Sequence, residues 1–373
     1  MLWEPLEHEV LCSMSRPRID TPVKRDILRL LTREPIVPLF RPFQRGVATI
    51  FMLHRFADSA YGNDGHSVDV LRTHLGYLRR HRYRIIGLPQ LLDELDERRL
   101  PTAPAVVFTV DDGYGDFARV AAPTFAEFDC PVTVFVTTAF IDGGFWMWYD
   151  KISWALLESK RTSVTVDVLG TAHAYPLGSV AARLWAASDL IERLKRVPEP
   201  VAQCAVNELL RLSDLELPAE IPNRFLPMTW DDVSRCAGQG VTFGPHTVTH
   251  PILSQVDDRR AIAELTDSWE RLKDSTTAAI PVFCYPNGDY ASFTERERRA
   301  LTSMGMRAAV LSDERFTTSR LARPNGAPST IELPRFPYPD DTTQFRQIVG
   351  GMERLKQTVR SVLSRDTATS RPQ

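Results

Sequence analysis

The order of hydrophobic and polar positions predicts alternating strands and helices over much of the chain. Apolar runs rich in β-branched residues favour strands at 46–53, 84–88, 105–110, 131–141, 241–244, 282–288 and 307–312. Helical periodicity favours helices at 67–83, 89–99, 115–129, 228–240, 257–275 and 294–304. The apolar stripe expected on the helix at 257–275 is Ile262, Leu265, Trp269 and Leu272. Such alternation predicts an α/β fold with parallel strands and crossover helices.

The alternation stops between residues 144 and 225, where helical patches surround a candidate hairpin at 162–178. We therefore interpret this segment as an insertion. The expected organisation has four parts: an N-terminal extension at 1–46, an α/β unit formed by 47–143 and 226–345, the insertion at 144–225, and a C-terminal helix and tail at 346–373.

Composition narrows the class of protein. The chain has 373 residues, of which 43% are hydrophobic and 25% charged, and a net charge of −2, so no basic footprint for nucleic acid is expected. Its five cysteines are scattered without a CxxC pair, which argues against a disulfide framework or a thiolate zinc site. The first twenty residues do not resemble a secretion signal, and no apolar run reaches the ~18 residues of a membrane span. We expect a soluble cytoplasmic protein; its oligomeric state stays open.

Two acidic residues follow a predicted buried strand in the stretch TVDDGYGD, residues 109–116. Asp111 and Asp112 could simply form a turn, because Asp-Gly is a common turn pair. They could also form a site, because ligand-binding groups of parallel α/β sheets gather at the carboxyl ends of strands.

A second stretch, GPHTVTHP at residues 244–251, also follows a predicted strand. Its two histidines, His246 and His250, are four residues apart. Two neutral imidazoles and one carboxylate suit a divalent metal with positions left for water and substrate. The spacing resembles that of the protease motif HExxH, but the glutamate is missing, so a zinc protease is not the expected function. Histidines in a loop more often cap a helix or face solvent than bind a metal. However, both stretches follow a predicted strand, and this shared position favours one common site.

Together these stretches resemble the first two motifs of the polysaccharide deacetylase family, carbohydrate esterase family four with its NodB-like homology domain. The segments FMLHRF, HLGYLRRHRYRIIGLPQLLDEL and VFCYPNGDY resemble its first strand, its first helix-strand-helix unit and its third motif. The resemblance covers roughly residues 47–140 and 226–340.

The resemblance implies a distorted (β/α)7 barrel, here with a mainly helical insertion, that removes acetyl groups from saccharides with one bound divalent metal. It implies Asp112, His246 and His250 as metal ligands and Asp111 as general base. The metal is commonly zinc, with cobalt, manganese, nickel and magnesium as alternatives. The metal would polarise the acetyl carbonyl and acidify its water. The backbone N–H of Tyr114 could hold the oxyanion.

The chain departs from the family pattern at two positions. Cys284 occupies the place of the third-motif arginine that pairs with the base, and we interpret it as a small core residue. Arg335 is the candidate substitute for that arginine. The equal alternative is that Arg335 forms a surface salt bridge. The late histidine that supplies the general acid is absent. His54, at the end of the first strand, is the candidate acid and is expected across the metal site from Asp111; a core or capping role is the alternative. The other histidines, expected at the surface, are His8, His66, His74, His81 and His173.

Aromatic side chains complete the expected site. Substrate contacts are predicted for Tyr114, Tyr285 and Trp146; the last begins an aromatic cluster that would roof the cleft or pack as core. The favoured function is deacetylation of an amino sugar or acetylated saccharide, an intracellular precursor in polysaccharide assembly. Two alternatives stay open: an amidase acting on a non-sugar C–N bond, and an inactive barrel that serves as a binding module.

Overall fold

Two parallel sheets curl around a common interior. The computed structural model describes residues 28–97, 100, 103–321 and 330–369. The larger sheet joins β1 (Val47–Leu53), β3 (Ala105–Val110), β4 (Val132–Val136) and β7 (Thr242–Pro245) in that order, all parallel, with short β2 (Arg84–Ile85) beside β3. The smaller sheet has the order β11 (Ile331–Pro334), β9 (Ala308–Leu311) and β8 (Val282–Cys284), also parallel.

One broken strand connects the two sheets. β11 pairs with β9, whereas β12 (Phe336–Pro337), directly after Arg335, pairs with β1. On the other side β7 meets the chain before β8 through an isolated bridge between Phe243 and Ala279. The antiparallel strand β10 (Thr317–Thr318) adds to the edge of β1. The result is a distorted α/β barrel, as the sequence predicts.

Side-chain alternation separates the barrel interior from the layer under the helices. The interior cluster contains Ala48 and Ile50 of β1, Val107 of β3, Phe135 of β4, Val282 of β8, Val310 of β9 and Leu333 of β11. Neighbouring positions such as Phe51, Phe108 and Val134 belong to the outer cluster, together with Leu75 and Phe125 from the helices. The strands are buried on both faces, which explains why they read as continuous apolar runs.

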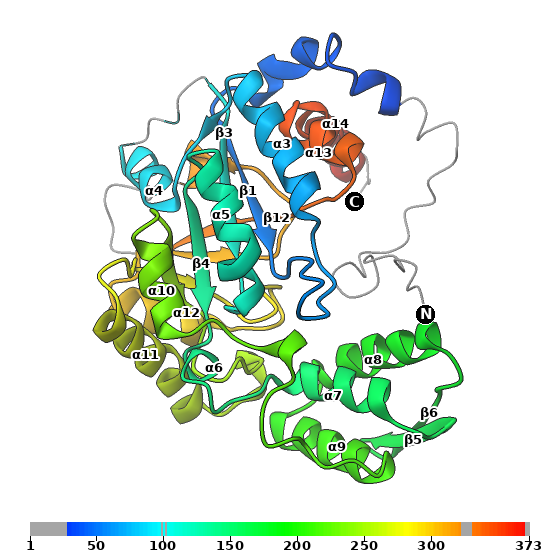
Figure 1. Ribbon diagram of the computed structural model, residues 1–373. Coiled ribbons are helices and arrows are strands. Elements are labelled where there is room, and N and C mark those ends of the chain that lie inside the picture. Colours follow the sequence, from blue (N-terminus) through cyan, green and yellow to red (C-terminus); the bar gives the residue numbers. More distant parts are fainter. Residues whose placement is uncertain (1–27, 98–99, 101–102, 322–329, 370–373) are drawn as a thin grey trace.

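Helices cover the outside of the barrel (Figure 1). They are α3 (Val68–Arg80), α4 (Leu88–Asp96), α5 (Ala122–Glu127), α10 (Trp230–Ala237), α11 (Asp258–Ser275), α12 (Glu295–Ser303), α13 (Thr342–Val349) and α14 (Met352–Thr369). The helix predicted at 115–129 begins with a π turn over Phe117–Ala121, just before Pro123, which lacks the N–H of a regular helix. The strand predicted at 131–141 ends at Val136, and α6 (Thr138–Ile141) takes its last residues.

Residues 148–212 pack around a core of their own. The segment contains α7 (Trp148–Glu158), the hairpin β5 (Ser163–Val168) and β6 (Thr171–Pro176), α8 (Val180–Leu194) and α9 (Glu199–Leu212). In Figure 1 it lies beside the barrel, beyond the carboxyl ends of β1 and β4.

The stripe expected on α11 is shifted by part of a turn. Ile262 is 36% exposed, whereas Ala261, Glu264 and Leu265 are buried. A charged residue therefore lies on the buried face of this helix.

His74 is not at the surface, contrary to the sequence-based expectation. It is fully buried on α3, where its Nδ1 lies 2.7 Å from the Tyr338 hydroxyl and its Nε2 lies 3.1 Å from Thr342 Oγ1. Its ring stacks on Phe345 with centroids 4.0 Å apart. These contacts hold α13 to α3. Burial lowers the pKa of His74 to about 4.

We predict that His74 makes the protein sensitive to mild acid. As the pH falls from about 6.5 to about 4, His74 takes up a proton in the unfolded chain but not in the folded one. The free energy of unfolding should therefore fall by about 3 kcal/mol over this range from His74 alone. In His74→Gln, less stable at neutral pH, chemical denaturation at several pH values should give a smaller decrease than in the wild type. His173→Gln, in the hairpin, is the control. Parallel pH curves for the wild type and His74→Gln would contradict this assignment.

Candidate active site

The candidate site lies where the inward-facing register of several strands reaches one end of the barrel. Gly244 shares this register, because a Cβ there would meet the Phe135 ring and the Val282 carbonyl oxygen, each at 2.5 Å. Asp111 lies four residues beyond Val107, and two residues separate Gly244 from His246, Val282 from Cys284 and Leu333 from Arg335. The inward-facing register therefore continues to Asp111, His246, Cys284 and Arg335. The end of each strand thus delivers one polar side chain to a common place.

Arg335 and Asp111 form a buried, bidentate ion pair. The two guanidinium nitrogens Nη1 and Nη2 each donate to one carboxylate oxygen at 2.7 Å, and the side chains are 1% and 4% exposed. Arg335 also donates to Thr109 Oγ1 at 3.0 Å and to the Leu311 carbonyl at 3.3 Å. Burial alone would raise the pKa of Asp111, but the Arg335 guanidinium holds it below its ordinary value. Arg335 therefore occupies the position of a partner to Asp111, and a surface salt bridge is excluded.

Asp112, His246 and His250 converge next to this ion pair. Their ligand atoms lie within 4.8 Å of one another; His246 Nε2 and His250 Nε2 are 3.4 Å and 3.5 Å from the same oxygen, Asp112 Oδ1. Two ligand atoms that are each about 2.1 Å from a tetrahedral ion lie about 3.4 Å apart. The three side chains are buried. Their spacing fits a small divalent cation with tetrahedral coordination.

The hydrogen bonds of the two imidazoles orient them for the same role. His246 Nδ1 donates to the Cys284 carbonyl oxygen at 2.8 Å, so Nε2 is the atom that faces Asp112. Burial opposes protonation of this ring, but its neighbours, Asp112 among them, raise the pKa of His246 well above its ordinary value, so a bound cation would have to displace the Nε2 proton. Burial lowers the pKa of His250 to about 3, so this ring is neutral. Metal ligation requires neutral imidazoles.

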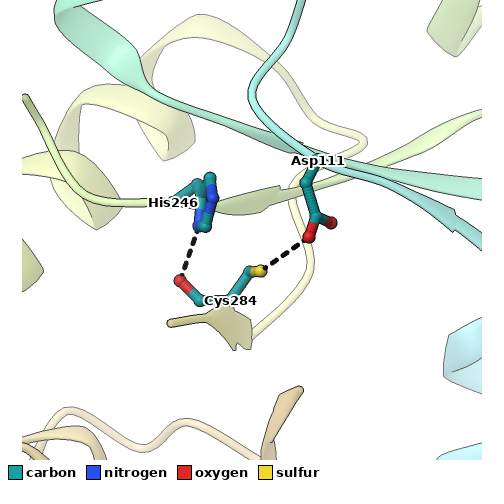
Figure 2. Close-up of side chains that lie close together, drawn as sticks. All are labelled: Asp111, His246 and Cys284. Atoms are coloured by element: carbon teal, nitrogen blue, oxygen red, sulfur yellow. Dashed lines mark hydrogen bonds between the residues drawn. The ribbon is translucent and has the colours of Figure 1, made fainter. Parts of the chain in front are cut away.

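A second group of potential ligands, Asp111, His246 and Cys284, also lies within 4.8 Å. Figure 2 shows His246 and Asp111 both turned toward Cys284, the first to its carbonyl oxygen and the second to its sulfur. This group is a poor cation site, because Arg335 already binds both oxygens of Asp111. Burial also raises the pKa of the Cys284 thiol, which disfavours the thiolate that a metal needs.

The turns that carry the ligands have unusual backbone conformations. Asp112, Thr247 and His250 have φ values of 74°, 66° and 55°, in the left-handed region that disfavours most side chains. Thr247 stabilises its turn: its hydroxyl donates to the His246 carbonyl and accepts from the His250 N–H at 3.0 Å. Strain of this kind is concentrated at functional sites.

Glu264, on the buried face of α11, supports the histidine turn and was missed by sequence reasoning. Its Oε2 accepts from the backbone N–H groups of Val248 and Thr249, each at 2.8 Å, and its Oε1 accepts from the Thr249 hydroxyl. The only sequence signal was a glutamate between two apolar positions of an amphipathic helix. Glu264 thereby fixes the residues immediately before His250.

His54 lies next to Asp111 rather than across the metal site. Its Nε2 is 3.8 Å from Asp111 Oδ2, and its side chain is 30% exposed, compared with 4% for Asp111. The His54 side chain is therefore far more accessible to a substrate than the Asp111 side chain. A wholly buried core role is excluded.

Two residues predicted to contact substrate are enclosed in the protein core. Tyr285 is 1% exposed and stacks on Phe293 at 3.8 Å. Trp146 is 6% exposed and packs against Trp154 and Phe225, each at 5.6 Å. Neither offers an open ring face, because tertiary packing of the insertion and of the chain after β8 covers both.

Tyr114 is also buried, and its hydroxyl donates to Asp150 Oδ2 at 2.6 Å. Only its backbone N–H stays a candidate for contact with substrate. Burial raises the pKa of Asp150 to about 7, although the Arg55 guanidinium and the Tyr114 hydrogen bond oppose the shift. Asp150 belongs to α7, so this hydrogen bond joins the insertion to the Asp111–Asp116 segment.

Tyr149, the residue before Asp150, was not singled out as a site residue. Its ring meets the His250 ring edge-on, with centroids 5.4 Å apart and an interplanar angle of 74°. Burial and the nearby carboxylates of Asp112 and Asp150 raise the pKa of its hydroxyl well above the ordinary value of 10. Tyr149 thus stands beside the proposed metal ligands as a protonated, half-buried phenol.

Comparisons with known proteins agree with this geometry. Residues 200–309 match the polysaccharide deacetylase family; this range contains the histidine turn but not Asp111 or Asp112. The Streptococcus pyogenes deacetylase PplD, determined in complex with acetate, is 16% identical and superposes with a TM-score of 0.50 over 80% of this chain and 94% of that one. IcaB from Ammonifex degensii gives 16% identity and a TM-score of 0.50 over 83% and 97%. At identities this low, the superpositions establish a shared fold and no shared activity.

Comparison with curated protein sequences gave no significant match. Within the described ranges, no helix has the length and apolar character needed to cross a membrane. Residues 200–309 thus match the polysaccharide deacetylase family, and the barrel has the fold of the PplD and IcaB structures.

Proposed function

We propose that this protein is a metal-dependent hydrolase that removes acetyl groups from an amino sugar or another acetylated saccharide. One observation carries the proposal: the Asp111–Arg335 ion pair lies beside the convergent Asp112, His246 and His250 side chains. A hydrolase of this type needs a base held apart from the cation ligands, and the two aspartates supply both parts. The family match and the deacetylase PplD support the same chemistry.

Each side chain has a distinct task in the proposed reaction. Asp112, His246 and His250 would hold a divalent cation, which would supply a Lewis acid to the acetyl carbonyl and to the attacking water. Asp111 accepts the proton of the attacking water, and Arg335 keeps this carboxylate ionised and oriented. His54 donates a proton to the leaving amine or alkoxide, for which its greater exposure suits it. The Tyr114 N–H is the proposed donor to the oxyanion.

We further propose zinc as the metal, on the basis of the 3.4–3.5 Å spacing between ligand atoms, and a precursor inside the cell as the substrate. The decisive experiment measures metal content by elemental analysis and acetate release from N-acetylated and O-acetylated oligosaccharides. Release from simple non-sugar amides alone would indicate the amidase. Bound oligosaccharide without release would indicate a binding module.

Loss of Asp112 should remove the metal. We predict that Asp112→Ala, purified and loaded like the wild type, retains less than about a tenth of its zinc, because one of three protein ligands is gone. Asp142→Ala, at an exposed ion pair with Arg271, is the matched control and should bind zinc normally. Full zinc occupancy in Asp112→Ala would place the cation elsewhere.

Loss of the carboxylate charge at position 111 should separate catalysis from metal binding. Asp111→Asn should lower acetate release by about 10²–10⁴-fold, the usual contribution of a general base. Its zinc content should stay near that of the wild type, because Asp111 pairs with Arg335 and not with the cation. If zinc is lost along with activity, Asp111 is a ligand and the division between the two aspartates is wrong.

Removal of the His54 ring should impair turnover while metal binding persists. His54→Ala is expected to lower kcat by about 10²-fold or more, the lower end of acid catalysis, at unchanged zinc content. His173→Ala, in the hairpin of the insertion, controls for the loss of an imidazole. Normal kcat in His54→Ala would mean that the leaving group takes its proton from water or another side chain.

A further inference from the structure

The helical insertion is attached directly to the catalytic motif. The Tyr114 hydroxyl, two residues after Asp112, donates to the buried Asp150 carboxylate at 2.6 Å. The Arg55 guanidinium lies 3.9 Å from the centre of the Tyr114 ring and is paired with Asp116 at 2.6 Å. Because all these groups are largely buried, the first turn of α7 is held in a defined position relative to the metal ligands.

This attachment places Tyr149 over the site. Its ring rests edge-on against His250, and its hydroxyl oxygen is 3.5 Å from the Tyr114 hydroxyl. The hydrogen of Tyr114 is already donated to Asp150 at the much shorter distance. The Tyr149 hydroxyl also lies within hydrogen-bonding reach of the Asp112 side chain, so this phenol can donate on the side where the proposed metal ligands converge.

Tyr149 comes from a different part of the fold than the proposed ligands and base. The ligands and the base project from the strand ends, whereas α7 lies beyond these ends (Figure 1). Tyr149 is half-buried, unlike the enclosed Tyr114, Trp146 and Tyr285. The Tyr149 phenol is thus a partly exposed group that the insertion adds beside His250.

We propose that Tyr149, carried by the insertion, is a further catalytic residue that donates a hydrogen bond to the acyl oxygen of the substrate. The inference rests on the proposed function. The phenol keeps its proton throughout: it stabilises the negative charge that develops on the oxygen when water adds to the acyl carbon, and no bond to Tyr149 forms or breaks. In this proposal the insertion contributes a residue to the active site in addition to packing beside the barrel.

The test uses Tyr149→Phe in the full chain, which removes the hydroxyl and keeps the ring against His250. Tyr175→Phe is the matched control, because Tyr175 is a buried tyrosine of the same insertion whose hydroxyl donates to Asp189 at 2.8 Å. Three quantities are measured for each protein: zinc content, the affinity of the cobalt-substituted protein for acetate from its visible absorption, and kcat/KM for acetate release.

We expect Tyr149→Phe to bind zinc normally, to bind acetate about tenfold more weakly or worse, and to lose about tenfold or more in kcat/KM, as for a lost hydrogen bond to a charged group. Tyr175→Phe should match the wild type. Unchanged acetate affinity and kcat/KM in Tyr149→Phe would overturn the proposal. So would a loss confined to zinc affinity, because Tyr149 would then only orient Asp112. A failure of the proposed function is distinguishable, since the wild type itself would release no acetate.

Discussion

The ion pair between Arg335 and Asp111 is the constraint on which the site depends. Removing a guanidinium and a carboxylate from water costs several kcal/mol for each ion, and only close, multiply bonded pairing offsets this cost. Arg335 satisfies the requirement with bonds to Asp111, Thr109 and the Leu311 carbonyl. These bonds join the ends of β3 and β9 at Arg335, the residue between β11 and β12. The contacts that close the barrel therefore also orient Asp111, the proposed base.

The same pair explains how the chain tolerates Cys284. The short thiol lies 3.4 Å from Arg335 Nη2 and 3.5 Å from Asp111 Oδ2, so it leaves room for a guanidinium that arrives from another strand. An arginine at 284 would place a second buried cation beside Arg335, whose repulsion a single carboxylate could not offset. Asp111, the proposed base, therefore has a cationic partner although position 284 is a cysteine.

Much of the fold and the centre of the site follow from local patterns. Buried strands are visible as apolar runs, and the register of β3 already directs Asp111 inward, because it lies four residues beyond Val107. The sequence could not place Tyr149 or Glu264, since both depend on how distant elements dock. The burial of Trp146, Tyr285 and His74 was not predicted for the same reason. Whether distant segments cover a ring cannot be inferred from the residues next to it in the sequence.

The precision of the ligand set is maintained by residues outside the motifs. Left-handed backbone at Asp112, Thr247 and His250 costs about 1–3 kcal/mol at each position, so isolated turns of these sequences would relax. Glu264 opposes this relaxation with bonds to two successive N–H groups, and Arg260 connects Thr249 and Glu264 to Glu199 of the insertion. The insertion thus reaches the ligands through α11 as well as through α7. The docking of the insertion and the geometry of the proposed metal ligands are therefore coupled through these contacts.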